Sequence, residues 1–113
     1  MPDDLPAPLR DLMDMLGPAG IADILGLVEP VWSEDIGRLR RAVADGAEGT
    51  IRDAAHKIKG SAGMCGFVEL AAAARALERG ASQRTALMAE LTALEGLVDD
   101  AVLRVRAWIA ALS

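Results

Sequence analysis

The hydrophobic positions of this 113-residue chain recur every three or four residues, which is the spacing of α-helices. No segment alternates apolar and polar residues for more than a few positions, so we find no candidate β-strand. The first helical stretch is short and amphipathic, and Gly17-Pro18 should stop it. Its apolar stripe consists of Leu5, Leu9, Leu12 and Leu16.

A second, longer stripe runs from Ile21 to Val43 and keeps its helical phase across Pro30. Proline has no N–H to donate, and its ring presses on the carbonyl four residues earlier, which belongs to Gly26. We therefore expect one long helix with a kink at about Gly26–Pro30. The Asp45-Gly46 pair then supplies a turn.

Three more helical stretches follow, separated by short connections that contain Gly66 and Gly80. Short connections make neighbouring helices antiparallel, and each helix has one apolar stripe to bury. The predicted fold is therefore all-α, an antiparallel up-down four-helix bundle with an N-terminal helical extension. We expect residues 1–17 to form the extension and residues 18–113 the bundle, within a single domain. The three stripes are Ile51/Ala55/Ile58/Ala62/Cys65, Leu70/Ala73/Ala74/Leu77 and Leu87/Leu91/Leu94/Val98/Ala101/Val105/Trp108/Leu112.

Composition and charge exclude several classes of function. Twelve basic against 17 acidic residues give a net charge of −5, which argues against a nucleic-acid partner. No apolar run approaches the roughly 20 residues needed to cross a bilayer, and the N-terminus is acidic, so we expect a cytoplasmic protein with no membrane partner. One His and one Cys cannot complete a four-ligand zinc site, so we expect no metal, and Cys65 falls on a core stripe.

The single histidine, His56, has an unusual place on its helix. At about 100° per residue it lies roughly 140° from the centre of the apolar stripe, so its ring should face solvent. Gly60 and Gly63 share this face, although glycine inside a helix costs about 0.5–1 kcal/mol relative to alanine. We interpret them as leaving room for something to approach the ring closely. The alternative is tight packing against another helix.

Positive charge gathers around the same ring. Lys59 lies one turn from His56, where its ammonium could bind an anion, and Arg52 and Lys57 are close in sequence. Each of them alone would be read as an ordinary solvated charge. Together with the glycines they indicate a face that tolerates an anion.

The run from Ala55 to Gly63, followed by Gly66 and Leu70, resembles the signature of histidine phosphotransfer (HPt) domains. The resemblance implies a helical bundle whose phosphoacceptor is His56, with Lys59 beside the phosphoryl group and Gly60 as the close-approach glycine. The polar partner of the acceptor falls on Glu78, which could fix the imidazole tautomer. A simple surface carboxylate, or one held by Arg75, is the alternative for Glu78.

By this resemblance the chain exchanges a phosphoryl group with aspartates of response-regulator receiver domains, after a hybrid histidine kinase has started the relay. We expect no cofactor of its own, and Mg²⁺ on the partner receiver. Partner contacts are expected at Arg52, Lys57, Gly63 and Met64. The chain has no nucleotide-binding motif, so it should be a carrier without ATP-dependent kinase activity.

Two other functions remain open on the sequence. The phosphoacceptor domain of a chemotaxis-type histidine kinase shares the His-x-x-Lys-Gly pattern and prefers Glu at the partner position. A helical adaptor that is never phosphorylated is the second. A hydrolase that uses His56 as its base is disfavoured, because no Ser or Cys nucleophile shares the face of the ring.

Overall fold

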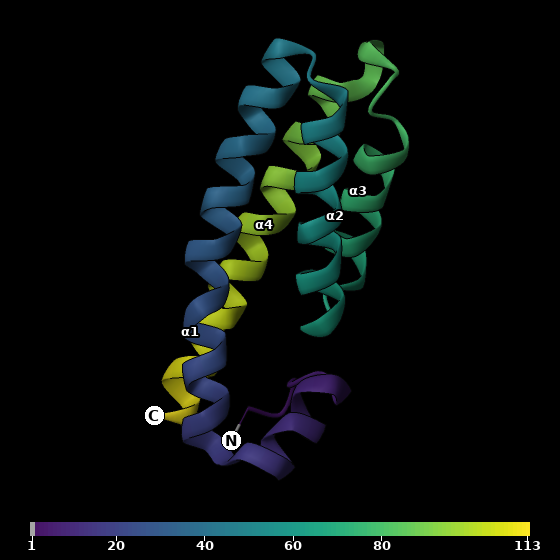
Figure 1. Ribbon diagram of the computed structural model, residues 1–113. Coiled ribbons are helices and arrows are strands. Elements are labelled where there is room, and N and C mark those ends of the chain that lie inside the picture. Colours follow the sequence, from purple (N-terminus) through teal and green to yellow (C-terminus); the bar gives the residue numbers. More distant parts are fainter. Residues whose placement is uncertain (1) are drawn as a thin grey trace.

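The computed structural model describes residues 2–113, apart from the side chains of residues 84 and 85. These residues form four helices and no strand: α1 (Ala7–Asp45), α2 (Glu48–Met64), α3 (Val68–Arg79) and α4 (Arg84–Leu112). The main bundle runs up, down, up and down in chain order within a molecule of 44 × 20 × 20 Å (Figure 1). The predicted antiparallel four-helix bundle is confirmed. No helix in the described residues is both long and apolar enough to cross a membrane.

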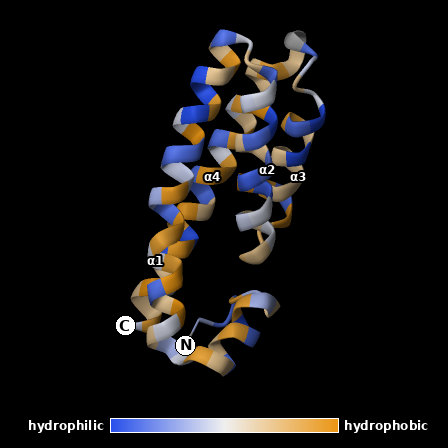
Figure 2. Cartoon of the chain, viewed as in Figure 1, coloured by the Kyte–Doolittle hydropathy of each residue, from blue (hydrophilic) through white to orange (hydrophobic). Residues whose placement is uncertain are grey.

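Each helix of the bundle packs against two neighbours, and one continuous core lies between them. Nearly all predicted stripe positions of α2 and α4 are buried, and Trp32 and Trp108 are the bulkiest fully buried side chains. Figure 2 shows hydrophobic residues concentrated in the lower half of α1, next to the N-terminal segment. Leu16 departs from the expected stripe, because 49% of its surface is exposed.

Helix α1 breaks at Gly17, where φ is 76° and ψ is 171°. A residue that precedes proline is disfavoured in the helical region, and only glycine adopts this positive φ freely, so Gly17-Pro18 turns the chain as expected. At Gly26–Pro30, where we expected a kink, the backbone keeps helical dihedrals, and the interruption of α1 lies at Gly17 instead. Gly26 and Pro30 are both exposed, so water can solvate the carbonyl that proline leaves without a donor.

The segment before Gly17 folds back under the bundle, where α2 ends (Figure 1). Leu5 and Leu9 are buried in the common core. The indole Nε1 of Trp108 donates to Asp4 Oδ1 at 2.9 Å, and the guanidinium of Arg104 lies 3.4 Å from Asp4 Oδ2. The N-terminal segment therefore closes this end of the core and is fixed to α4.

The turn from α2 to α3 is built around Gly66, which adopts φ 76°. The N–H of Phe67 donates to the carbonyl of Ala62 at 2.9 Å, and the N–H of Gly66 to that of Gly63 at 3.1 Å. This pair of bonds is the Schellman arrangement that ends helices at a left-handed glycine. Pro6 packs on the same glycine, so that an added Cβ would lie 2.4 Å from Pro6 Cβ.

We expect Gly66→Ala to lower the free energy of unfolding by about 1–3 kcal/mol, because the new methyl group meets both a positive φ and Pro6. Urea denaturation measures the change. Gly96→Ala is the matched control, since Gly96 is helical and a Cβ there meets nothing within 4 Å in the part of the chain that the structure describes. That control should gain about 0.5–1 kcal/mol. Equal stability of Gly66→Ala and the parent would contradict the role given to this turn.

Candidate functional site

His56 lies in the middle of α2 and faces solvent, as its helical phase predicts. Its side chain is 68% exposed, while Ala55 and Ile58 on the same helix are fully buried. The burial of the α2 stripe fixes the rotation of the helix, and this rotation points the imidazole outwards. The ring is therefore accessible to a large partner.

The carboxylate of Glu78 in α3 holds both His56 and Lys59. Its Oε2 lies 2.7 Å from His56 Nδ1, and its Oε1 accepts a hydrogen bond from Lys59 Nζ at 3.0 Å. Residues from two antiparallel helices meet here because the Gly66 turn folds α3 back along α2. Among the described residues Arg75 makes no ion pair with Glu78, so the alternative partner considered for this carboxylate is wrong.

The local charges keep Glu78 ionised. The hydrogen bond from Lys59 lowers the pKa of Glu78 below its ordinary value of 4.5, against the opposing effect of desolvation, and the bond to His56 adds to the lowering. Because the pKa of Glu78 is lowered on folding, the ionised carboxylate stabilises the folded state at pH values above 4.5. This contribution is lost as the pH falls through the lowered pKa. At neutral pH Glu78 is therefore an acceptor only.

This assignment fixes the tautomer of a neutral His56. An ionised carboxylate can only accept, so the proton of the imidazole must lie on Nδ1. Nε2 is then unprotonated, and its lone pair is directed away from Glu78. The same logic orients the base in other pairs of histidine and carboxylate.

Gly60 and Gly63 are not explained by packing within the chain. A Cβ built at either position meets no atom of the described residues within 4 Å, whereas one at Gly66 would collide with Pro6. Both glycines are exposed on α2 beside the imidazole. The structure therefore argues against tight packing of these glycines on another helix. The interpretation that remains is that they leave room for a partner to approach the ring.

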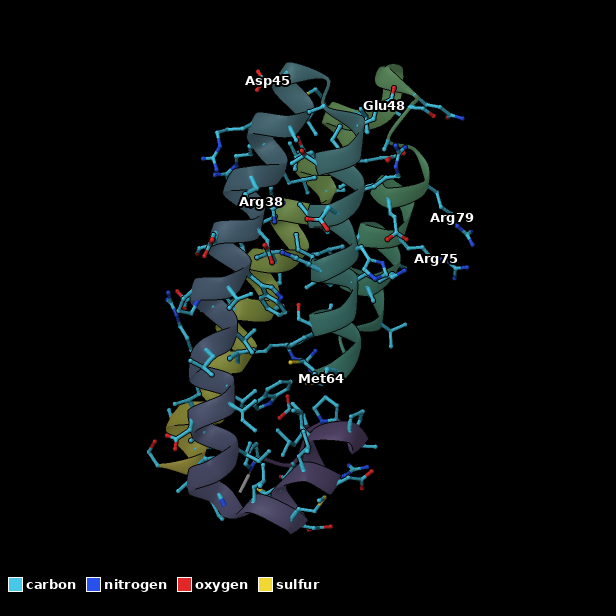
Figure 3. The ribbon with its side chains drawn as sticks, in the orientation of Figure 1. Arg38, Asp45, Glu48, Met64, Arg75 and Arg79 are labelled. Carbon is cyan, nitrogen blue, oxygen red and sulfur yellow. The ribbon has the colours of Figure 1, made fainter. Side chains whose placement is uncertain are left out.

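The other residues expected at a partner interface are exposed but less closely tied to the imidazole. Arg52 lies 3.9 Å from Glu48, and Lys57 lies 4.0 Å from Asp53, both one turn away on α2. Met64 is 56% exposed at the end of α2 nearest the N-terminal segment (Figure 3). The structure thus brings His56, Lys59 and Glu78 together, whereas Arg52, Lys57 and Met64 are exposed elsewhere along α2.

Sequence reasoning missed the contact that fixes α1 against α2 beside the site. The indole of Trp32 is fully buried and donates from Nε1 to Ser61 Oγ at 2.6 Å. The hydroxyl of Ser61 lies 3.2 Å from the carbonyls of Lys57 and Ile58, to either of which it can donate. A buried tryptophan usually needs an acceptor for its N–H, and this was the available signal.

A second missed contact involves Arg38 of α1. Its guanidinium donates to Asp53 Oδ2 at 2.9 Å and lies 3.7 Å from Asp35, whose pKa is raised by burial. Asp53 precedes His56 by one turn on α2. Polar contacts therefore join α2 to α1 on both sides of His56 in the sequence, through Asp53 before it and Ser61 after it.

The model of the Hpt domain family matches residues 23–111. The chain belongs to the Hpt domain family. Members of this family carry phosphoryl groups in two-component signalling, where they act with kinases and response regulators and are not themselves kinases. No curated protein and no solved structure gives a significant match. The segment that folds under the bundle before Gly17 lies outside the matched region.

Proposed function

We propose that His56 of this Hpt domain accepts and donates a phosphoryl group on Nε2, in exchange with an aspartate of response-regulator receiver domains. The observation that carries the proposal is the 2.7 Å contact between Glu78 Oε2 and His56 Nδ1, with the rest of the ring facing solvent. This contact leaves the outward nitrogen unprotonated and nucleophilic. The general association of the family with phosphotransfer supports the assignment.

In the forward step the lone pair of Nε2 attacks the phosphorus of the receiver's aspartyl phosphate. The N–P bond forms as the P–O bond to the aspartate breaks, and the aspartate leaves as a carboxylate. No proton has to leave Nε2, because the tautomer held by Glu78 carries its proton on Nδ1. The resulting imidazolium charge is next to the Glu78 carboxylate, and the reverse step returns the group to an aspartate.

Other residues of the site assist by charge and by space. Lys59 has three ammonium hydrogens, of which Glu78 takes one, so others can reach phosphoryl oxygens. Gly60 and Gly63 leave open space beside the ring. Phosphoryl transfer depends mainly on positioning and on neutralising oxygen charge, so such a site needs few further groups. In the described residues no three His, Cys, Asp or Glu side chains gather as metal ligands. The receiver would supply Mg²⁺.

The partners that we propose are receiver domains and a hybrid histidine kinase, with Arg52, Lys57, Gly63 and Met64 among the contact residues. The phosphoacceptor domain of a chemotaxis-type kinase is a second candidate, because it also prefers a carboxylate at the position of Glu78. The phosphate donor separates the two. Loading by phosphorylated receivers supports the relay, and loading only by a kinase with ATP supports the second candidate.

His56→Gln should abolish uptake of acid-labile phosphate from a phosphorylated receiver, because the proposed nucleophile is gone. The fold should persist, since the side chain is exposed and its one hydrogen bond among the described residues is to Glu78. Radiolabelled phosphate on the chain measures uptake, and circular dichroism checks the helices. Thr50→Gln, at an exposed position near the start of α2, is the control that should transfer normally. Uptake by His56→Gln at the parental level would place the acceptor elsewhere.

Gly60→Leu tests the access argument. The added side chain has open space within the chain, so stability should be unchanged or higher by about 0.5–1 kcal/mol. Transfer from a phosphorylated receiver should fall by about tenfold or more, because a small misplacement of the reacting groups is enough to slow such a step. Stopped-flow or quench-flow transfer rates provide the measurement.

Gly96→Leu in α4 is the matched control for this substitution, since its Cβ position is equally open. It should transfer at the parental rate. If Gly60→Leu also did so, the open face in front of the imidazole would have no part in transfer.

A further inference from the structure

Helix α3 presents a stripe of exposed residues along its outer face. Val68, Ala72, Arg75 and Arg79 are all exposed, and their spacing of four, three and four places them on one side of the helix. Val68 is 77% exposed. Figure 3 shows Arg75 and Arg79 extending away from the bundle. This face has no role in the core or in the transfer step described above.

The stripe borders an open groove of about 440 Å³ that begins at the proposed transfer site. The groove is lined from α2 by Lys59, which also contacts Glu78, and from α3 by Arg75, Arg79, three alanines and Val68. Three of the lining residues are cations and none is a carboxylate. The groove therefore has a floor of small apolar side chains and a positively charged lining. The net charge of the whole chain, in contrast, is −5.

The arginines of this groove are not used to hold the fold together. Five other arginines contact carboxylates: Arg38 with Asp53, Arg40 with Glu95, Arg52 with Glu48, Arg104 with Asp4 and Arg106 with Glu29. Among the described residues, neither Arg75 nor Arg79 lies within 4.0 Å of a carboxylate, and Glu78 between them is bound to Lys59 and His56. Their charges are therefore free to act on a partner.

We propose that this groove docks an acidic surface segment of the receiver domain that exchanges phosphate with His56, and that Arg75 and Arg79 select the partner. The inference rests on the proposed function. A receiver whose aspartate reaches His56 must also lie close to Lys59, because Glu78 joins the two side chains, and the groove continues from Lys59 along α3. An acidic segment matches the two free arginines, Arg75 and Arg79, and the alanines let its backbone approach closely.

The shape of the groove favours a protein segment over a small anion. The groove is open, and Arg75 and Arg79 are exposed, so its described lining offers no buried donor to enclose a free phosphate. Arginine is a frequent residue at protein interfaces, where its stem packs on apolar surface and its head pairs with a carboxylate. Charges at the edge of an interface act mainly on the association rate and on its salt dependence.

The test compares two double variants that carry the same change of charge, from −5 to −7. One is Arg75→Ala with Arg79→Ala. The control is Arg10→Ala with Arg41→Ala, both exposed positions on α1 with no ion pair within 4.0 Å among the described residues. Transfer is measured from a receiver domain that has been phosphorylated with acetyl phosphate in Mg²⁺ and that loads the parent chain. The ionic strength is varied, and phosphoramidate loading of His56 is measured in parallel.

The groove variant should lose about tenfold in kcat/KM at low ionic strength, with kcat unchanged, and the loss should shrink as salt is added. Arg75→Lys with Arg79→Lys should restore most of the rate, because the charge is retained. Phosphoramidate loading should be the same in all variants, since it needs no docking. The control should lose much less than the groove variant.

Equal transfer rates for the groove and control variants would contradict the docking role of the groove and leave the proposed function intact. A loss that does not respond to salt would also overturn it, as would a concentration-dependent dimer of the parent chain that the groove variant abolishes. The last result would assign the groove to a second copy of this acidic chain. A parent chain that no phosphorylated receiver can load would instead contradict the proposed function, and the groove assignment with it.

Discussion

The left-handed turn at Gly66 is the constraint on which the geometry of the site depends. With φ at 76° it reverses the chain between α2 and α3 within a few residues, and Glu78 then reaches His56 across 22 positions of sequence. The missing side chain also leaves the space that Pro6 occupies, so the same residue seats the N-terminal segment under the bundle. One backbone conformation thus sets both the pairing of the two central helices and the closure of the core.

The carboxylate of Glu78 makes this site suitable for phosphoryl transfer, because it binds His56 and Lys59 at the same time. One oxygen accepts a hydrogen bond from Nδ1 of the imidazole, and the other accepts one from the Lys59 ammonium. The exposed histidine thereby gains a defined tautomer and a neighbouring cation. Both contacts lie on an open surface that a partner can reach. Such a site suits a carrier that meets its partners in turn, and the positive groove along α3 gives it a means of choosing among them.

The bundle and the exposure of His56 could be predicted from the sequence because both follow from helical periodicity. Burial of Ile51, Ile58 and the intervening alanines rotates α2 in only one way. The pairing of Glu78 with His56 came from family resemblance, not from periodicity. The bond from Trp32 to Ser61 and the anchoring of Asp4 by Trp108 were not predicted, because periodicity does not set how far one helix slides along another.

Local signals also had limits along α1. Pro30 was expected to bend the helix, yet its exposed position lets the backbone stay helical, while Gly17 carries the break because its dihedrals are open only to glycine. Arg75 was considered as a partner for Glu78, a role that Lys59 fills from the neighbouring helix. The second outcome was decided by a contact between two helices, which spacing along one helix does not reveal.

In the mechanism that we propose, Glu78 leaves Nε2 of His56 as the nitrogen that carries phosphate. Long-range ¹H–¹⁵N and ³¹P NMR spectra of the chain, labelled at histidine and loaded by a phosphorylated receiver, test it directly. We expect an N–P bond at Nε2 of His56 with the proton retained on Nδ1. A phosphoryl group on Nδ1, or on any residue other than His56, would contradict it.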